Sequence, residues 1–188
     1  MANQAQTKRS AVFLDRDGVI NMPVVRDGRP YPPATVEEFC IYPDAAPACA
    51  LLKDAGFVLV VATNQPDVGR GIQSREAVEG MHARMAAALP IDRIEVCYDA
   101  LAEGSECYKP APGMLLQAAG QMALDLSQSY MVGDRWRDVD CGHAAGCTTI
   151  FIDRGYTEKL CEQPDYLATS LLNAAEIIVG LRRGWRKY

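Results

Sequence analysis

The chain has 188 residues, of which 49% are hydrophobic and 23% charged, and its formal net charge is -5. That length and composition suit a globular protein with one buried core, so we expect residues 1–188 to form a single domain. The weakly acidic balance excludes a general nucleic-acid binder, which carries a basic footprint. Apolar stretches well below the ~18 residues of a membrane span exclude a transmembrane protein.

The N-terminal residues and the cysteines indicate a compartment. Residues 1–10 are polar, lack the apolar core of a secretory signal and are expected to be flexible. The seven cysteines are odd in number and unevenly spread, unlike the disulfide framework of a small secreted domain. We therefore place the protein in the reducing cytoplasm, and separately we expect a monomer.

Taken in chain order, short apolar runs alternate with segments of helical periodicity. The runs are rich in β-branched residues and predict strands buried on both faces at 11–14, 57–62, 94–97, 130–132 and 148–152. The periodic segments predict helices at 44–55, 74–89, 112–124, 138–145 and 170–181. This alternation predicts an α/β fold, a doubly wound three-layer sandwich around a central parallel sheet.

Polar residues stand where the predicted strands end, and none of them belongs to the apolar pattern. In chain order they are Asp15, Asp17, Thr63, Asn64, Gln65, Lys109, Asp134 and Asp138. Ligands of such sheets bind beyond the carboxyl ends of the strands, so we expect these side chains to converge there.

The residue types at this edge predict phosphoryl-transfer chemistry. Asp15 and Asp17 are two apart on an extended segment, so both side chains can lie on one side, with Asp134 as a third acid. Mg²⁺ takes carboxylates together with waters and phosphate oxygens. One carboxylate can attack phosphorus and a second can act as acid and base. Thr63 and Lys109 can stabilise the transferred group, which predicts a Mg²⁺-dependent phosphatase of a small phosphorylated metabolite.

Four separated motifs carry a resemblance to a known family. They are Asp15-x-Asp17-Gly18-x-x-Asn21, Thr63-Asn64-Gln65, Lys109-Pro110 and Gly133-Asp134-x-x-x-Asp138. In this order they resemble the haloacid dehalogenase superfamily. The DRDGVIN and TNQ forms resemble the branch of D-glycero-D-manno-heptose 1,7-bisphosphate 7-phosphatases and histidinol-phosphatases, which implies a heptose bisphosphate-like sugar phosphate or histidinol phosphate as substrate.

The resemblance implies a role for each matching residue. Asp15 is the nucleophile and Asp17 the acid and base, while Mg²⁺ is held by Asp15, Asp134 and the main-chain carbonyl of Asp17. Thr63 and Lys109 bind the transferring phosphoryl group, and Asp138 supports Lys109 or the metal from behind. Substrate contacts are expected from Arg16, Asn21, Asn64, Gln65, Arg70, Tyr108 and Arg135.

The spacing of the motifs leaves no room for a large cap domain. Asp17 and Thr63 are 46 positions apart, as are Thr63 and Lys109, and each interval already holds a predicted helix and strand. The capless architecture of the superfamily therefore fits. Residues 23–43, with Asp27-Gly28 as a hairpin turn, are predicted to form a small flap over the site.

The loop 97–108 departs from the pattern of the heptose enzymes. Those relatives carry a structural zinc, whereas here the four ligand positions hold Cys97, Asp99, Ser105 and Cys107. This is a poor ligand set, so we expect a zinc-free loop held by hydrogen bonds and packing. Tyr108 replaces the arginine that precedes the catalytic lysine in these relatives, and a phenol does not pair bidentately with a distal phosphate.

Other functions remain open at this point. A receiver domain also places a phosphorylatable Asp, a Thr and a Lys on a doubly wound sheet. Its Asp follows a middle strand, however, and it has no acid that corresponds to Asp17. An inactive sugar-phosphate binder conflicts with the intact acids. Mutases and phosphonatases that share the nucleophile usually carry caps.

Overall fold

A six-stranded parallel sheet forms the centre of the computed structural model, which describes residues 8–27 and 29–184. The strand order is β5-β4-β1-β6-β7-β8, and every neighbouring pair runs parallel. The strands are β1 (Ala11–Leu14), β4 (Val58–Asn64), β5 (Arg93–Cys97), β6 (Tyr130–Gly133), β7 (Thr148–Ile152) and β8 (Tyr166–Ala168). The predicted fold class is confirmed.

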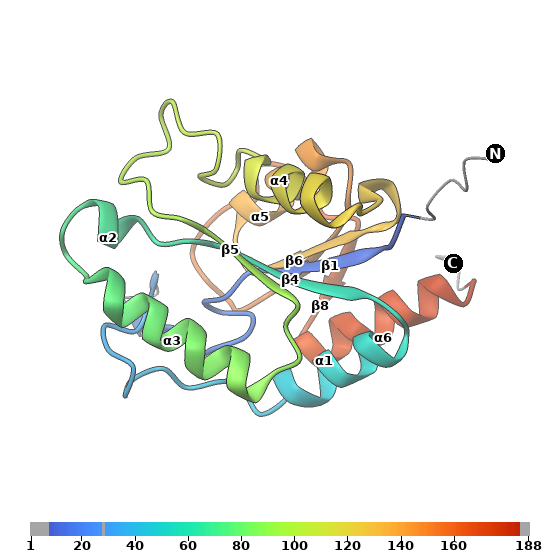
Figure 1. Ribbon diagram of the computed structural model, residues 1–188, viewed down its shortest axis with the longest axis horizontal. Coiled ribbons are helices and arrows are strands. Elements are labelled where there is room, and N and C mark those ends of the chain that lie inside the picture. Colours follow the sequence, from blue (N-terminus) through green and yellow to red (C-terminus); the bar gives the residue numbers. More distant parts are fainter. Residues whose placement is uncertain (1–7, 28, 185–188) are drawn as a thin grey trace, which may run out of the picture.

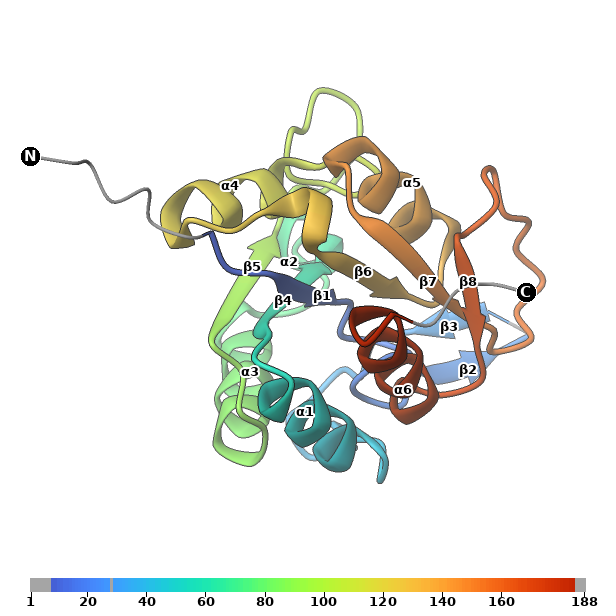
Figure 2. The ribbon, with the colours of Figure 1, turned by 90° about the vertical axis from the view of Figure 1, so that its right-hand side faces the viewer.

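Helices cover both faces of this sheet (Figures 1 and 2). One face carries α1 (Ala45–Asp54), α3 (Arg75–Ala88) and α6 (Leu171–Arg182), and the other carries α4 (Gly113–Met122) and α5 (Trp136–Ala145). The short helices α2 (Pro66–Gly69) and η1 (Leu126–Gln128) lie in connections. Three layers result, as the alternation of the sequence predicts.

Alternation of side chains along β1 shows how the sheet divides the core in two. Val12 and Leu14 pack into the cluster under α1 and α6, whereas Ala11 and Phe13 pack into the cluster under α4 and α5. All four are fully buried. An apolar strand with such neighbours on both faces has little choice of register, which fixes the position of Asp15 at its end.

All the predicted strands and helices are present, and three short elements, α2, η1 and β8, were not predicted. Strand β8 has three residues, and its central Leu167 is 65% exposed, so no apolar run marks it. Helix α5 begins at Trp136 rather than at Asp138, because an Asp138 carboxylate oxygen accepts a hydrogen bond from the Arg135 N–H (3.1 Å) at the helix start.

A two-stranded hairpin stands within the predicted flap. Strands β2 (Val24–Arg26) and β3 (Arg29–Tyr31) pair antiparallel, and Asp27 in the turn has a φ of 50°. Gly28 of the predicted turn lies outside the described residues, as do residues 1–7 of the predicted flexible N-terminus, whereas Arg9 bridges to Leu124. In the described part of the chain no cap domain interrupts the sheet connections, and no helix there is long and apolar enough to cross a bilayer.

Candidate active site

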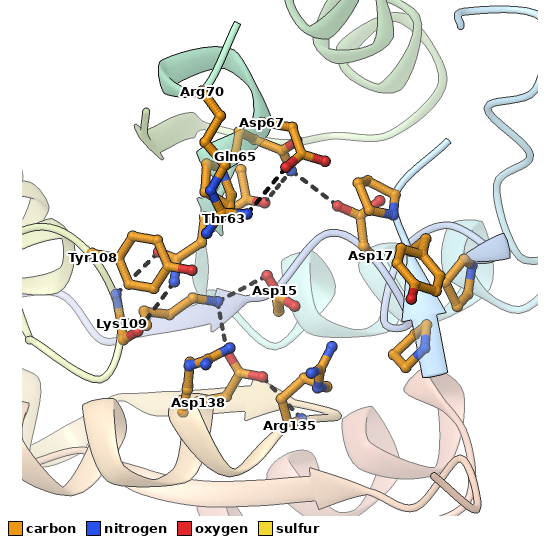
Figure 3. Close-up of a pocket in the computed structure, with 17 residues that line it drawn as sticks. Asp15, Asp17, Thr63, Gln65, Asp67, Arg70, Tyr108, Lys109, Arg135 and Asp138 are labelled. Carbon is orange, nitrogen blue, oxygen red and sulfur yellow. Dashed lines mark hydrogen bonds and ion pairs between the residues drawn. The ribbon is translucent and has the colours of Figure 1, made fainter. Parts of the chain in front are cut away.

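A cleft opens at the carboxyl edge of the sheet, bordered by the hairpin (Figure 3). The predicted residues that line it are Asp15, Asp17, Thr63, Asn64, Gln65, Arg70, Tyr108, Lys109, Arg135 and Asp138. They come from the ends of β1 and β4, from the residue after α2, from the loop after β5 and from the start of α5. Convergence follows from the parallel topology, which brings the carboxyl ends of successive strands to one edge.

Lys109 joins two acids at the floor of the cleft. Its Nζ donates to Asp15 Oδ1 (2.8 Å), Asp138 Oδ1 (2.5 Å) and the Ala62 carbonyl (2.8 Å). Burial opposes a charge on Lys109, but the Asp138 and Asp15 carboxylates outweigh it and raise the pKa of the amine. Lys109 is therefore a fixed ammonium beside Asp15, where the charge of a phosphoryl group would develop.

Three buried acids lie together around the ammonium of Lys109. Carboxylate oxygens of Asp15, Asp134 and Asp138 lie within 4.8 Å of one another. Burial raises the pKa of Asp15 to about 6 despite the opposing charge of Lys109. Burial together with the charges of Asp15 and Asp138 also raises the pKa of Asp134 well above its usual value. Such a cluster has excess negative charge at low dielectric, which a divalent cation relieves.

Asp134 supplies a direct test of whether these residues fit a metal. It is 1% exposed, and neither of its carboxylate oxygens has a hydrogen bond of good geometry in the described structure, although the Tyr156 hydroxyl faces the carboxylate. A Cβ added to Gly18 would stand 1.8 Å from Asp134 Oδ2, so only glycine, here at a φ of 91°, lets the β1 loop approach this acid. A buried carboxylate with spare acceptor capacity beside Asp15 fits a hard cation such as Mg²⁺.

Asp17 is held in its ionised form at the side of the cleft. Arg16 donates to both of its oxygens (2.8–3.2 Å), Asn21 donates to Oδ1 (3.0 Å) and Gln65 to Oδ2 (2.9 Å). Burial opposes the charge, but Arg16 and the hydrogen bonds bring the pKa of Asp17 below its usual value. A side chain that is 19% exposed and ionised is placed to accept a proton from a molecule in the cleft.

The side chains of Arg16 and Asn21, which are predicted to contact substrate, lie outside the cleft. Both side chains are fully buried behind Asp17, and neither lines the cleft. Their donors are engaged with Asp17, and Arg16 Nη1 also contacts His82 Nε2 (3.1 Å) from α3. They position the acid and are not exposed to a ligand.

The segment Thr63-Asn64-Gln65 connects these groups. Gln65 Nε2 donates both to Thr63 Oγ1 (2.9 Å) and to Asp17, which ties the hydroxyl to the acid. The Asn64 amide donates to the Lys109 carbonyl (3.1 Å) and accepts from its N–H (3.0 Å). Asn64 therefore fixes the main chain of Lys109, which differs from the contact with substrate that is predicted for it.

Comparisons with known proteins agree with this geometry. A family model described as HAD-hydrolase-like matches residues 106–174. The D-glycero-D-manno-heptose-1,7-bisphosphate 7-phosphatase of Thermosynechococcus vestitus is 35% identical over 90% of this chain and 95% of its own. The D-glycero-beta-D-manno-heptose-1,7-bisphosphate 7-phosphatase of Pseudomonas aeruginosa is also 35% identical, over 83% and 88%. The chain belongs to the phosphatases of the haloacid dehalogenase (HAD) superfamily.

Solved structures resemble this HAD chain over most of their length. The D,D-heptose 1,7-bisphosphate phosphatase from B. bronchiseptica, complexed with magnesium and phosphate, gives a TM-score of 0.77 at 27% identity, covering 93% of this chain and 99% of its own. A putative HAD-like phosphatase from Mesorhizobium loti gives 0.73 at 29% identity, over 93% and 87%. These matches confirm the capless HAD fold.

The HAD chain differs from the prediction in the loop 97–108. Cys97 and Cys107 are joined in a disulfide, whereas the predicted loop is held by hydrogen bonds and packing. Ser105 Oγ lies 3.7 and 3.5 Å from the two sulfurs, and Asp99 Oδ2 lies 3.5 Å from that of Cys107. The four positions do come together, but a disulfide offers no thiolate, so this set does not fit a zinc ion.

Two residues of the site escaped the sequence analysis. His82 lies 66 positions from Arg16, and no local pattern links a histidine inside α3 to the first catalytic loop. Arg137 lines the cleft from the first turn of α5. Its position in the sequence between Asp134 and Asp138 could have predicted that it lies at the cleft, because residues within a motif at a strand end lie at the same edge of the sheet.

Proposed function

We propose that this chain is a Mg²⁺-dependent phosphomonoester hydrolase that forms an aspartyl-phosphate on Asp15, with a small phosphorylated sugar as its substrate. The observation that carries the proposal is the cluster of Asp15, Asp134 and Asp138, whose carboxylate oxygens lie within 4.8 Å of one another, with the Lys109 ammonium bound to Asp15 and Asp138. The sugar-bisphosphate names of the relatives support the substrate class. Residues 1–188 would act as one catalytic domain, with the segment 23–43 as a flap.

The side chains divide the proposed reaction into two steps. Asp15 attacks the phosphorus, the bond to the sugar oxygen breaks, and Lys109 and Thr63 balance charge on the phosphoryl oxygens. Asp17, which takes up a proton when the anionic phosphate binds beside it, donates that proton to the leaving oxygen and then takes one from the water that hydrolyses the acyl phosphate. Its lowered pKa suits the second step, so the hold of Arg16 on Asp17 favours the base form.

Mg²⁺ would be held by the carboxylates of Asp15 and Asp134 and the main-chain carbonyl of Asp17. When bound, the ion polarises phosphoryl oxygens and neutralises the acids that would otherwise repel an anionic substrate. The magnesium in the related B. bronchiseptica structure supports this choice of metal.

Phosphate release from a panel of sugar phosphates, histidinol phosphate, nucleotides and p-nitrophenyl phosphate tests the proposal. With Mg²⁺ the wild type should turn over continuously, and EDTA or Asp15→Asn should reduce kcat by ~10³-fold or more. Asp54→Asn is the matched control, since Asp54 is an exposed acid at the end of α1. Phosphate release by Asp15→Asn at the wild-type rate would exclude the mechanism. A single turnover followed by a stable phosphoprotein would favour a receiver-like acceptor.

A further inference from the structure

Three guanidinium groups line the cleft, and they differ in what already binds them. Arg135 at the start of α5 pairs with Glu158 through two contacts. Arg70, which follows α2, donates to Asp67 (3.2 Å) and to the Ala100 carbonyl (3.0 Å). Both are therefore substantially neutralised or fixed by the protein itself.

Arg137 is bound differently, although it lines the same cleft. Across residues 8–27 and 29–184 the guanidinium of Arg137 makes no ion pair with an acid and no hydrogen bond. Its guanidinium carbon lies 5.0 Å from the centre of the Trp136 ring and 5.9 Å from that of the Tyr108 ring. Aromatic faces hold a guanidinium in place through its π surface and leave its N–H edge available.

The position of this group relates it to the reacting centre. Tyr108 directly precedes Lys109, whose amine contacts Asp15, and Arg137 directly precedes Asp138, which binds the same amine. Figure 3 shows Tyr108 on the side of the cleft away from Asp17, and the Arg137 guanidinium lies against the Tyr108 ring. A substrate whose phosphate reacts at Asp15 would extend a second group into their reach.

We propose that Arg137, held between Trp136 and Tyr108, binds a second phosphate of the substrate and so makes the enzyme selective for sugar bisphosphates. This inference rests on the proposed phosphatase function and adds a specificity-determining residue to it. A planar fork of N–H donors matches phosphate bidentately, which the phenol of Tyr108 does not. Tyr108 then orients the guanidinium instead of contacting the phosphate as its main ligand.

Steady-state kinetics on a hexose 1,6-bisphosphate and the matching hexose 6-phosphate test the role of Arg137. A charge-assisted hydrogen bond to phosphate is typically strong enough that Arg137→Gln should lower the bisphosphate-to-monophosphate ratio of kcat/KM by ~10–100-fold, mainly through KM. Arg137→Lys should restore part of the ratio, since it keeps the charge but loses the fork. Arg75→Gln is the control, because Arg75 also stacks on a tyrosine, Tyr98, but pairs with Glu79 outside the cleft.

The outcomes separate this inference from the proposed function. If wild-type enzyme hydrolyses p-nitrophenyl phosphate and Arg137→Gln leaves the ratio within about two-fold of wild type, the inference is wrong and the phosphatase function stands. An equal loss on both sugar substrates would also overturn it, because a residue that binds only the distal phosphate does not act on a monophosphate. If wild-type enzyme hydrolyses none of the substrates, the proposed function itself fails.

Discussion

The buried contact between Arg16 and His82 should give the stability of the protein a pH dependence that one substitution removes. Burial and then the charge of Arg16 lower the pKa of His82 from 6.5 to about 4. The folded protein therefore keeps His82 neutral while the unfolded chain takes up a proton below pH 6.5. Because the unfolded state then binds more protons, the contribution to stability is complete above that pH and is lost toward pH 4. At about 1.4 kcal/mol per pKa unit, the loss amounts to about 3 kcal/mol.

Urea unfolding of wild type and His82→Gln in EDTA measures this contribution. The glutamine amide oxygen can still accept a hydrogen bond from Arg16 but carries no titrating group. Between about pH 7.5 and about pH 4 the wild type should lose ~3 kcal/mol more than the variant. The clustered acids of the cleft titrate in both proteins, so their contribution cancels in the difference. Parallel pH profiles for the two proteins would refute the assignment of a neutral, buried histidine.

Two further substitutions probe the floor of the cleft. Lys109→Met removes the ammonium from between two buried carboxylates. It should reduce kcat by ~10³-fold and destabilise the metal-free protein by ~3 kcal/mol. An unchanged kcat on p-nitrophenyl phosphate would contradict the proposed role of Lys109. Gly18→Ala drives a Cβ into Asp134 and should weaken Mg²⁺ affinity in calorimetry, whereas Gly146→Ala, at a similar φ with open space, should cost about 1 kcal/mol of stability and leave the affinity intact.

The acids, the hydroxyl and the lysine of the cleft could be predicted because a parallel sheet converts sequence position into spatial position. Asp15, Thr63 and Asp134 each end a buried apolar strand, and the strands have one register that keeps their apolar side chains inside. Proximity at the carboxyl edge then follows without any contact information. The same residues predict a hard divalent cation such as Mg²⁺, since the preference of a metal for oxygen ligands depends only on residue type.

Contacts between residues far apart in the chain, and very short strands and helices, could not be predicted from the apolar pattern. Whether Arg16 points into the cleft or back toward His82 depends on how α3 packs against the β1 loop, and no periodic pattern records that packing. The disulfide between Cys97 and Cys107 depends on a loop conformation that their 10-residue separation does not fix. Strand β8 is too short and too exposed for its apolar pattern to stand out.

The covalent step on Asp15 can be observed directly by mass spectrometry. Trypsin releases residues 10–16, a peptide in which Asp15 is the only carboxylate side chain. Acid quenching of Asp17→Asn during turnover should give this peptide with one added phosphoryl group that hydroxylamine removes, because the variant lacks the proposed base that activates the hydrolytic water. The same peptide should stay unmodified in Asp15→Asn. A phosphoryl group on any other peptide, with residues 10–16 unmodified during active turnover, would contradict the role of Asp15 as nucleophile.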